Sequence, residues 1–273
     1  CTLQPERDHT GPDAPGVVPL AKPPRVAWVF SSGGPRGFVH VGVLQALDEL
    51  GLRPDVIVGA SAGALVGTLF AAGMPARQIV QEAMHLQPWQ LLRWAPGGSQ
   101  RWAATGLADW VQQAVGNRPL QDLALPMVCA VQRLRDGAVL GFNHGDAGLA
   151  VQAAGAIEGR LTPVVIRGEA YADADQRMPL PVRLARGLGA SRVLAIDASA
   201  HEDRAPEGAE RYRAGDLLKR ALTLPDARLA DLVLQPDFGY WVSLSDDFKR
   251  RAIAAGYQAT LAAAPALRAL HAS

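Results

Sequence analysis

The sequence predicts an α/β protein with three layers, α/β/α, around a mostly parallel central sheet. Apolar runs typical of fully buried strands occur at 25–30, 55–58 and 192–197. Strands buried on both faces give such continuous runs, and they are characteristic of parallel sheets covered by helices. The order strand, helix, strand, helix over 25–72 indicates a right-handed βαβ unit, which makes its two strands parallel.

The remaining elements follow from turn and capping signals. Gly51 closes the helix that follows the first strand, and Gly73 closes the second helix, because glycine readily takes the conformation that ends a helix. Asp136-Gly137 lies between two apolar runs and predicts a β-hairpin. The predicted elements after the first strand are helices over 38–50, 62–72 and 246–264, the hairpin 127–132 with 139–142, and strands over 55–58, 192–197 and 231–234.

The composition indicates one large domain between two short terminal segments. Of the 273 residues, 49% are hydrophobic, which suits a domain with a sizeable core. Residues 1–24 contain six prolines and no apolar periodicity, so we expect a disordered or extended tether. The domain is expected over 25–265, followed by a C-terminal tail over 266–273.

The first residue, Cys1, predicts a processed N-terminus. A chain that begins with Cys after removal of a signal peptide resembles a mature bacterial lipoprotein, acylated on that sulfur. On this hypothesis Cys1 is lipidated and anchors the protein to a membrane surface, at the outer membrane facing the periplasm. An arbitrarily shortened chain is the alternative. The other cysteine, Cys129, lies in an apolar run and does not suggest a disulfide.

Charge and residue spacing exclude several classes of function. The net charge is +1, so no long-range field favours a nucleic-acid partner. No run of eighteen or more apolar residues suggests a transmembrane helix. The histidines have no metal-ligand spacing, and we expect neither a metal nor another cofactor. Nothing in the sequence indicates an oligomeric state.

A G-x-S-x-G pattern, Gly59-Ala60-Ser61-Ala62-Gly63, lies between a predicted strand and a predicted helix. A sharp strand-to-helix turn strains the serine backbone and needs small neighbours. It places the serine hydroxyl at the carboxyl edge of the sheet, where open α/β sheets bind ligands. The N–H of Ala62 begins the helix and would point toward a developing oxyanion. The pattern therefore predicts Ser61 as a nucleophile, although a turn that only packs a helix closely is the alternative.

A second glycine-rich stretch, Ser32-Gly33-Gly34-Pro35-Arg36-Gly37, follows the first strand. Such loops expose N–H groups that can hold an anion. The stretch matches neither common nucleotide-binding pattern. Arg36 stands at a helix start, where a cation opposes the helix dipole, so we expect it to have an anionic or backbone partner.

The two motifs together resemble the start of a patatin-like phospholipase domain, in which a G-G-G-x-R-G loop precedes a G-x-S-x-G elbow. The likeness begins with residues 26–73. It continues through 150–159 and 171–182, where Asp173 stands at the position of the family's catalytic aspartate. It covers roughly residues 25–265 and implies the patatin-like version of the three-layer fold.

The resemblance implies a serine acyl hydrolase with a Ser61–Asp173 dyad and no histidine. Asp173 would accept the Ser61 proton during attack on an ester carbonyl. The oxyanion would be held by backbone N–H groups, whereas Pro35 has none to give. The implied substrates are carboxyl esters of phospholipids or lysophospholipids. The implied donors are Gly33, Gly34, Arg36 and Gly37, in addition to Ala62.

Three residues depart from the family pattern. Ser32 replaces the first glycine of the loop, and Ala174 and Asp175 replace the small pair after the catalytic aspartate. Ala174 would be strained if that position needed a positive φ. Asp175 adds a second carboxylate, and nearby like charges favour one staying protonated. A catalytically impaired, lipid-binding lipoprotein on the same fold is therefore one alternative.

Two further hypotheses concern other side chains. Ser61, Asp173 and His201 have the chain order of an α/β-hydrolase triad, although His201 lies in a charged loop. Residues 85–111 contain four tryptophans. This segment is either a packed helical cap or an acyl-binding or membrane-facing surface, since tryptophan suits lipid interfaces.

Overall fold

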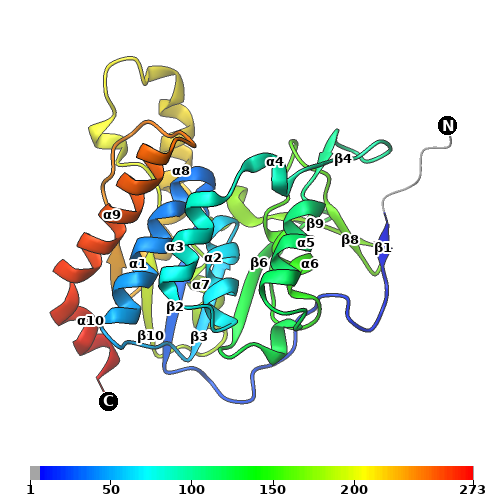
Figure 1. Cartoon of the computed structure of the whole chain (residues 1–273), viewed down its shortest axis with the longest axis horizontal. Helices are drawn as coiled ribbons and strands as arrows, with labels where there is room; N and C mark the ends of the chain where they lie inside the picture. The colour runs from blue at the N-terminus through cyan, green and yellow to red at the C-terminus, as the bar shows by residue number, and fades with distance from the viewer. Residues whose placement is uncertain (1–6, 273) are drawn as a thin grey trace.

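A computed structural model describes residues 7–272, and its centre is a nine-stranded sheet (Figure 1). The strands of this sheet are β1 (Asp8–His9), β2 (Val26–Phe30), β3 (Val56–Ala60), β6 (Met127–Arg133), β7 (Val139–Phe142), β8 (Val164–Ile166), β9 (Glu169–Asp173), β10 (Arg192–Ile196) and β11 (Leu232–Leu234). The short strands β4 (Arg93–Trp94) and β5 (Trp102–Ala103) form a separate pair. The α-helices are α1 (Phe38–Glu49), α2 (Ala62–Ala71), α3 (Ala76–His85), α4 (Pro88–Leu91), α5 (Thr105–Ala114), α6 (Ala147–Ala154), α7 (Val182–Gly187), α8 (Arg213–Ala227), α9 (Asp246–Ala262) and α10 (Ala264–His271).

The strand order is β1-β8-β9-β6-β3-β2-β10-β11, with β7 pairing beside β6. The pairs from β6 through β3, β2 and β10 to β11 are parallel. Three pairs are antiparallel, namely β6 with β7, β6 with β9 and β8 with β9. The predicted mostly parallel sheet is therefore confirmed, whereas the strands β1, β8 and β9 of this sheet were not predicted from the sequence.

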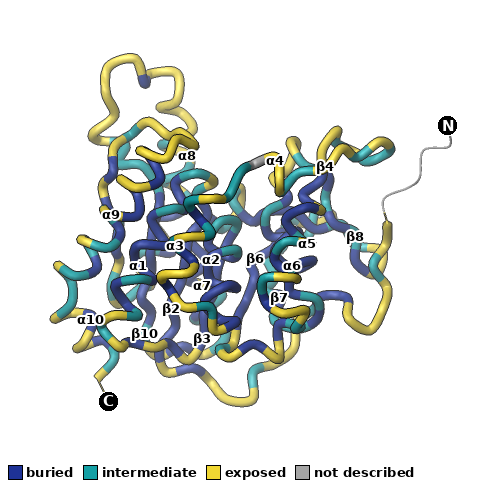
Figure 2. The backbone as a smooth tube through the Cα atoms, viewed as in Figure 1, coloured by how far each residue is buried: buried dark blue, intermediate teal, exposed yellow. Residues whose placement is uncertain are grey.

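Helices cover both faces of the sheet because each strand sends alternate side chains to opposite sides. Trp28 and Phe30 pack with α1 and α2 on one face. Ala27 and Val29 pack against α7 on the other. All five residues of β2 and all five of β3 are buried, and Figure 2 shows these strands as the buried centre of the molecule. The three-layer prediction is confirmed.

Most predicted elements match the structure within a few residues. The hairpin forms as β6 and β7, with Gly137 at φ 70° in its turn. The predicted strand over 231–234 is β11, and the predicted last long helix is α9. The local signals were sufficient here because each element carries its own buried face and its own terminator.

Both terminal predictions need correction within the described residues. Residues 8–16 are not a free tether: β1 pairs with β8, and Gly16 forms a bridge with His144. The predicted tail 266–273 largely belongs to helix α10, in which Leu267 is fully buried. Packing of a few apolar side chains and main-chain pairing outweighed the local polar composition. Cys1, the predicted lipidation site, lies outside the described residues.

Two findings bear on membranes and metals. Over residues 7–272, no helix is long and apolar enough to cross a membrane. The same part of the chain contains no group of three or more His, Cys, Asp or Glu placed to hold a metal ion.

Candidate active site

Ser61 lies at the turn between β3 and α2 in a strained backbone conformation, with φ 51° and ψ −120°. The two flanking glycines make this turn possible. A Cβ at Gly59 would lie 2.4 Å from the Gly63 carbonyl oxygen, and a Cβ at Gly63 would lie 2.4 Å from the Phe30 carbonyl oxygen. Strain of this kind persists where the surrounding structure enforces it, often at active sites. The Ser61 elbow predicted from the sequence is present.

Strand register brings Asp173 next to Ser61. Ala60, just before the serine, pairs with Ala130 of β6, and the next residue, Val131, pairs with Asp173 of β9. Asp173 thus ends its strand two strands away from Ser61, at the same level of the sheet. The Ser61 hydroxyl and the Asp173 carboxyl group line the same pocket, where the hydroxyl can act as a hydrogen-bond donor to the carboxyl group.

The Asp173 carboxyl group is buried, with only 2% of the residue exposed. Burial raises its pKa to about 7, because it penalises the charged form. The neighbouring Asp175 charge also raises the pKa. The Ser61 hydroxyl and the Asp175 N–H, which donates to Asp173 at 2.9 Å, lower it. A carboxylate with a pKa near neutrality can both accept and return a proton.

The glycine-rich loop packs directly against the elbow. Gly34 has φ 51°, a conformation that favours glycine, and begins a 3-10 turn over Gly34–Gly37. A Cβ at Gly37 would lie 2.4 Å from the Ala62 Cβ, so glycine there allows the loop to reach the start of α2. The N–H groups in the first turn of α2 have no acceptor within the helix. Of the predicted oxyanion residues, Gly34, Gly37 and Ala62 line one cavity with Ser61, and Gly33 lines a second pocket that also contains Gly34 and Ser61.

Arg36 is not an oxyanion donor, contrary to the sequence prediction. Its N–H donates to the Gly33 carbonyl at 3.0 Å. Its buried guanidinium donates to the carbonyls of Ala198, Gly239 and Tyr240 and lies 4.3 Å from the Phe238 ring centre. Arg36 thus has the backbone partners that its unfavourable place on the helix dipole suggested, and it fixes the loop to the segments after β10 and after β11.

The departures from the family pattern are accommodated. Ala174 does not have a positive φ. Its buried methyl group packs with Ala60 and Ala130. The expected strain does not arise. Asp175 is not a free second base, because it pairs with Lys219 and accepts a hydrogen bond from Ser32. Although burial raises the pKa of Asp175, these two partners outweigh it and lower the pKa below its usual value.

The histidines lie elsewhere. His201 Nε2 is 3.1 Å from the Gln235 carbonyl oxygen, within the loop after β10. His40 is fully buried in α1 with Nε2 2.8 Å from the Ser31 carbonyl oxygen, and burial lowers its pKa to about 4. The partner of Ser61 is thus a carboxyl group, which favours the dyad over the triad.

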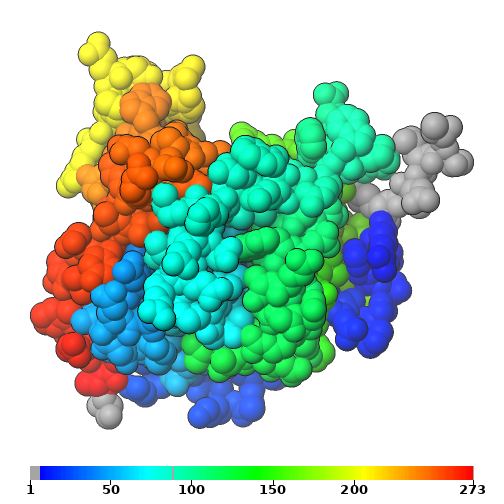
Figure 3. Space-filling view, in the orientation of Figure 1, coloured from blue at the N-terminus to red at the C-terminus, as the bar shows by residue number. Residues whose placement is uncertain are grey.

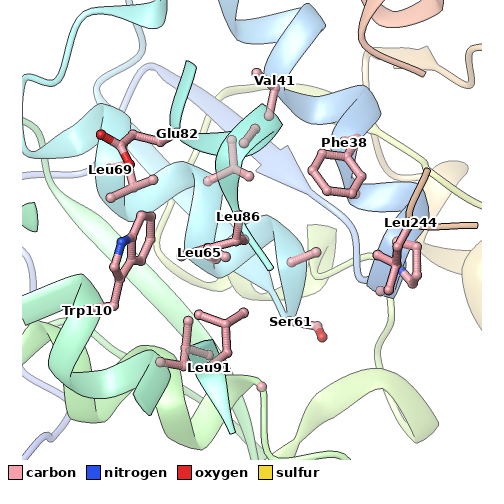
Figure 4. Close-up of a pocket in the computed structure, with 18 of the residues that line it drawn as sticks. Phe38, Val41, Ser61, Leu65, Leu69, Glu82, Leu86, Leu91, Trp110 and Leu244 are labelled. Atoms are coloured by element: carbon pink, nitrogen blue, oxygen red, sulfur yellow. The ribbon is translucent and has the colours of Figure 1, made fainter. Parts of the chain in front are cut away.

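An apolar cavity of about 330 Å³ opens beside Ser61. Figure 4 shows Leu65, Leu86 and Leu91 around the space next to the serine, with Trp110 further along one wall. The segment over 85–111 therefore contributes an apolar wall of the cavity, while its Trp89 is 71% exposed. The lining also includes Phe38, Val41, Leu69, Ile79, Leu92, Leu107, Ile157 and Leu244.

A polar pocket of about 260 Å³ lies on the other side of the serine. It shares Gly34, Ser61 and Ile157 with the apolar cavity. Its charged lining residues are Arg36, Asp173, Asp175, Asp216 and Lys219. The segment around residues 200–213, yellow in Figure 3, projects at the upper left of the molecule. Ser61 thus stands between an apolar and a polar compartment.

Comparison with known proteins agrees with this geometry. The sequence profile of the family described as patatin-like phospholipase matches residues 28–186, which include both Ser61 and Asp173. The chain belongs to the patatin-like phospholipase family. An uncharacterized NTE family protein of Mycobacterium tuberculosis is 32% identical over 202 residues, 72% of this patatin-like chain and 55% of that protein. Lysophospholipase NTE1 of Coccidioides immitis is 27% identical over 192 residues, 67% of this chain and 12% of its own.

The crystal structure of VipD from Legionella pneumophila has a similar fold, with a TM-score of 0.53. The likeness covers 97% of this chain and 72% of VipD at 12% sequence identity, so it concerns the fold alone. This patatin-like chain spans about half the length of the mycobacterial relative and a small part of NTE1.

Sequence reasoning missed Lys219 and Leu244. Lys219 is separated from Ser32 by 187 positions, yet its ammonium lies 2.6 Å from the Ser32 hydroxyl. Leu244 reaches the apolar cavity from the loop before α9. No local pattern marks either residue, because only the folded chain brings α8 and that loop to the site.

Proposed function

We propose that this protein is a serine acyl hydrolase that cleaves carboxyl esters of phospholipids or lysophospholipids through the Ser61–Asp173 dyad. The observation that carries the proposal is the placement of a strained, elbow-mounted serine in one pocket with a buried carboxyl group whose pKa is about 7. Membership of the patatin-like phospholipase family supports the reaction class.

In the proposed reaction, the Ser61 oxygen attacks the ester carbonyl carbon while Asp173 takes the hydroxyl proton. The carbonyl electron pair moves onto the oxygen, where N–H groups of the glycine loop and of Ala62 stabilise the charge. When the intermediate collapses, the ester C–O bond breaks and Asp173 returns the proton to the leaving alkoxide. Water then attacks the acyl-enzyme, gives its proton to Asp173, and the fatty acid leaves as Ser61 regains that proton.

The two compartments support a lipid ester as substrate. An acyl chain would occupy the apolar cavity, since burial of methylene groups is favourable by about 0.8 kcal/mol each. The glycerol and head group would then face the polar pocket on the other side of Ser61. The relative named lysophospholipase NTE1 supports including single-chain substrates in the proposal.

The test is fatty-acid release from a panel of phospholipids, lysophospholipids and p-nitrophenyl esters. We expect hydrolysis of at least one lipid class, labelling of the wild type by a fluorophosphonate, and loss of both in Ser61→Ala. The loss should exceed about a thousandfold, and the fold should be unchanged by circular dichroism. An unlabelled wild type would instead favour the lipid-binding alternative, and activity retained in Ser61→Ala would exclude Ser61 as the nucleophile.

A further inference from the structure

Three polar side chains from separate elements meet beside the dyad. Ser32 comes from the glycine-rich loop, Asp175 from the turn after β9 and Lys219 from α8. The same Asp175 oxygen accepts hydrogen bonds from the Ser32 hydroxyl and from the Lys219 ammonium. Lys219 also donates to the Ser32 hydroxyl at 2.6 Å. We call these three residues the lysine cluster.

The lysine cluster connects the base to the oxyanion loop. The Asp175 N–H donates to Asp173 at 2.9 Å, while the Asp175 carboxylate holds Ser32. Ser32 in turn donates its N–H to the Pro179 carbonyl at 2.8 Å and directly precedes Gly33. A displacement of Asp175 would therefore move both the proton acceptor and the loop that faces the oxyanion. Two of the three departures from the family pattern, Ser32 and Asp175, belong to the lysine cluster and contact each other.

Two charged side chains near Asp173 have opposite effects on its pKa. Asp175 raises the pKa of Asp173 and Lys219 lowers it. The other charged side chains lining the polar pocket have partners away from Asp175: Arg36 donates through Nε and Nη1 to backbone carbonyls, although its buried Nη2 has no partner in the described chain, and Asp216 accepts from the Tyr240 hydroxyl. Among the described residues that line this pocket, Lys219 is thus the cation that pairs with Asp175, whose charge acts on Asp173.

We propose that Lys219 is a positioning residue for catalysis: it neutralises Asp175 and fixes the turn that carries Asp173 against the oxyanion loop. The proposal rests on the dyad proposed above. Lys219 does not touch the reacting atoms; it acts through Asp175 and Ser32. The cluster would compensate for the family glycines that this chain lacks.

The test compares the pH dependence of kcat/KM in two single variants. The acid limb is the fall of kcat/KM at low pH, where Asp173 becomes protonated. In Lys219→Met the unpaired Asp175 charge should move this limb to higher pH by roughly one unit and lower activity at pH 6 about tenfold. In Asp175→Asn the acid limb should move in the opposite direction, because the like charge is gone. The double variant should fall between them. The matched control is Arg220→Met. Arg220 is the next residue of α8, and it pairs with Glu202 at 3.4 Å. The acid limb of this variant should equal that of the wild type.

Movement of the acid limb in opposite directions in the two single variants supports the proposal. A merely structural role would lower turnover and thermal stability without moving the acid limb. An unmoved limb in either single variant, in protein whose activity still depends on Ser61, overturns it. If Lys219→Met does not fold, Asp175→Asn alone decides, since its limb must move to lower pH. Activity that survives in Ser61→Ala would instead refute the dyad on which the proposal rests.

Discussion

Replacing Asp173 by Asn should abolish activity and at the same time stabilise the fold at alkaline pH. The pKa of Asp173 is about 7 in the folded chain and about 3.9 for an aspartate in an unfolded one. The folded state therefore binds the proton more tightly, and stability is lost as pH rises from the unfolded value to the folded value. Since one pKa unit corresponds to about 1.4 kcal/mol, the ionised carboxylate costs about 4 kcal/mol above pH 7.

Asn removes this cost and still allows hydrogen bonds, because its oxygen can accept from the Asp175 N–H and its amide can donate to Ser61. The gain in unfolding free energy should be about 1.5 kcal/mol at pH 5 and at most about 4 kcal/mol at pH 8. Denaturant titrations of both proteins at the two pH values measure it. Ester hydrolysis should fall by at least about a thousandfold, since the Ser61 proton has no acceptor.

Asp226→Asn is the matched control. Asp226 is fully buried like Asp173, but it pairs with Arg183 at 2.8 Å. Neutralising it should destabilise the fold, because the buried Asp226 side chain loses its ion pair with the half-exposed Arg183, and should leave the chemistry of Ser61 intact. A stability gain in Asp173→Asn that does not grow with pH would refute the burial argument, and more than about one per cent residual activity would place the base elsewhere.

Three further predictions concern the neighbouring parts of the site. Gly34→Ala should lower turnover about a hundredfold or more, because it displaces the oxyanion donors. The control is Gly51→Ala, which has a similar positive φ at an open position and should suffer the same backbone strain without losing turnover. Equal turnover in the two variants would exclude the loop from the mechanism. His201→Ala should cost less than about tenfold in kcat/KM, and a loss as large as that of Ser61→Ala would indicate a triad. Ala83→Phe places a ring in the apolar cavity that Ala83 lines. Hydrolysis of long-chain p-nitrophenyl esters should therefore fall, while hydrolysis of p-nitrophenyl acetate should be kept. An unchanged dependence on chain length would show that the acyl chain binds elsewhere.

The sequence determined the features that depend on short-range signals. Buried strands, glycine-terminated helices and the hairpin turn were predictable because each depends on neighbouring residues. The Ser61 elbow was predictable for the same reason, since Gly59 and Gly63 are needed within two positions of the serine. Asp173 was reached only through resemblance to a family, because nothing local distinguishes it from Asp175.

Only the tertiary structure decided which groups act together. The antiparallel pairing of β9 with β6 places Asp173 beside Ser61, and burial then raises its pKa. Lys219 turns Asp175 from a competing base into a paired charge, and the backbone partners of Arg36 remove it from the oxyanion hole. Asp8 and His9, which form β1, pair with β8, although the N-terminal segment has a composition typical of disorder. These outcomes depend on contacts between distant segments and on exclusion of water, and neither is written in a local run of sequence.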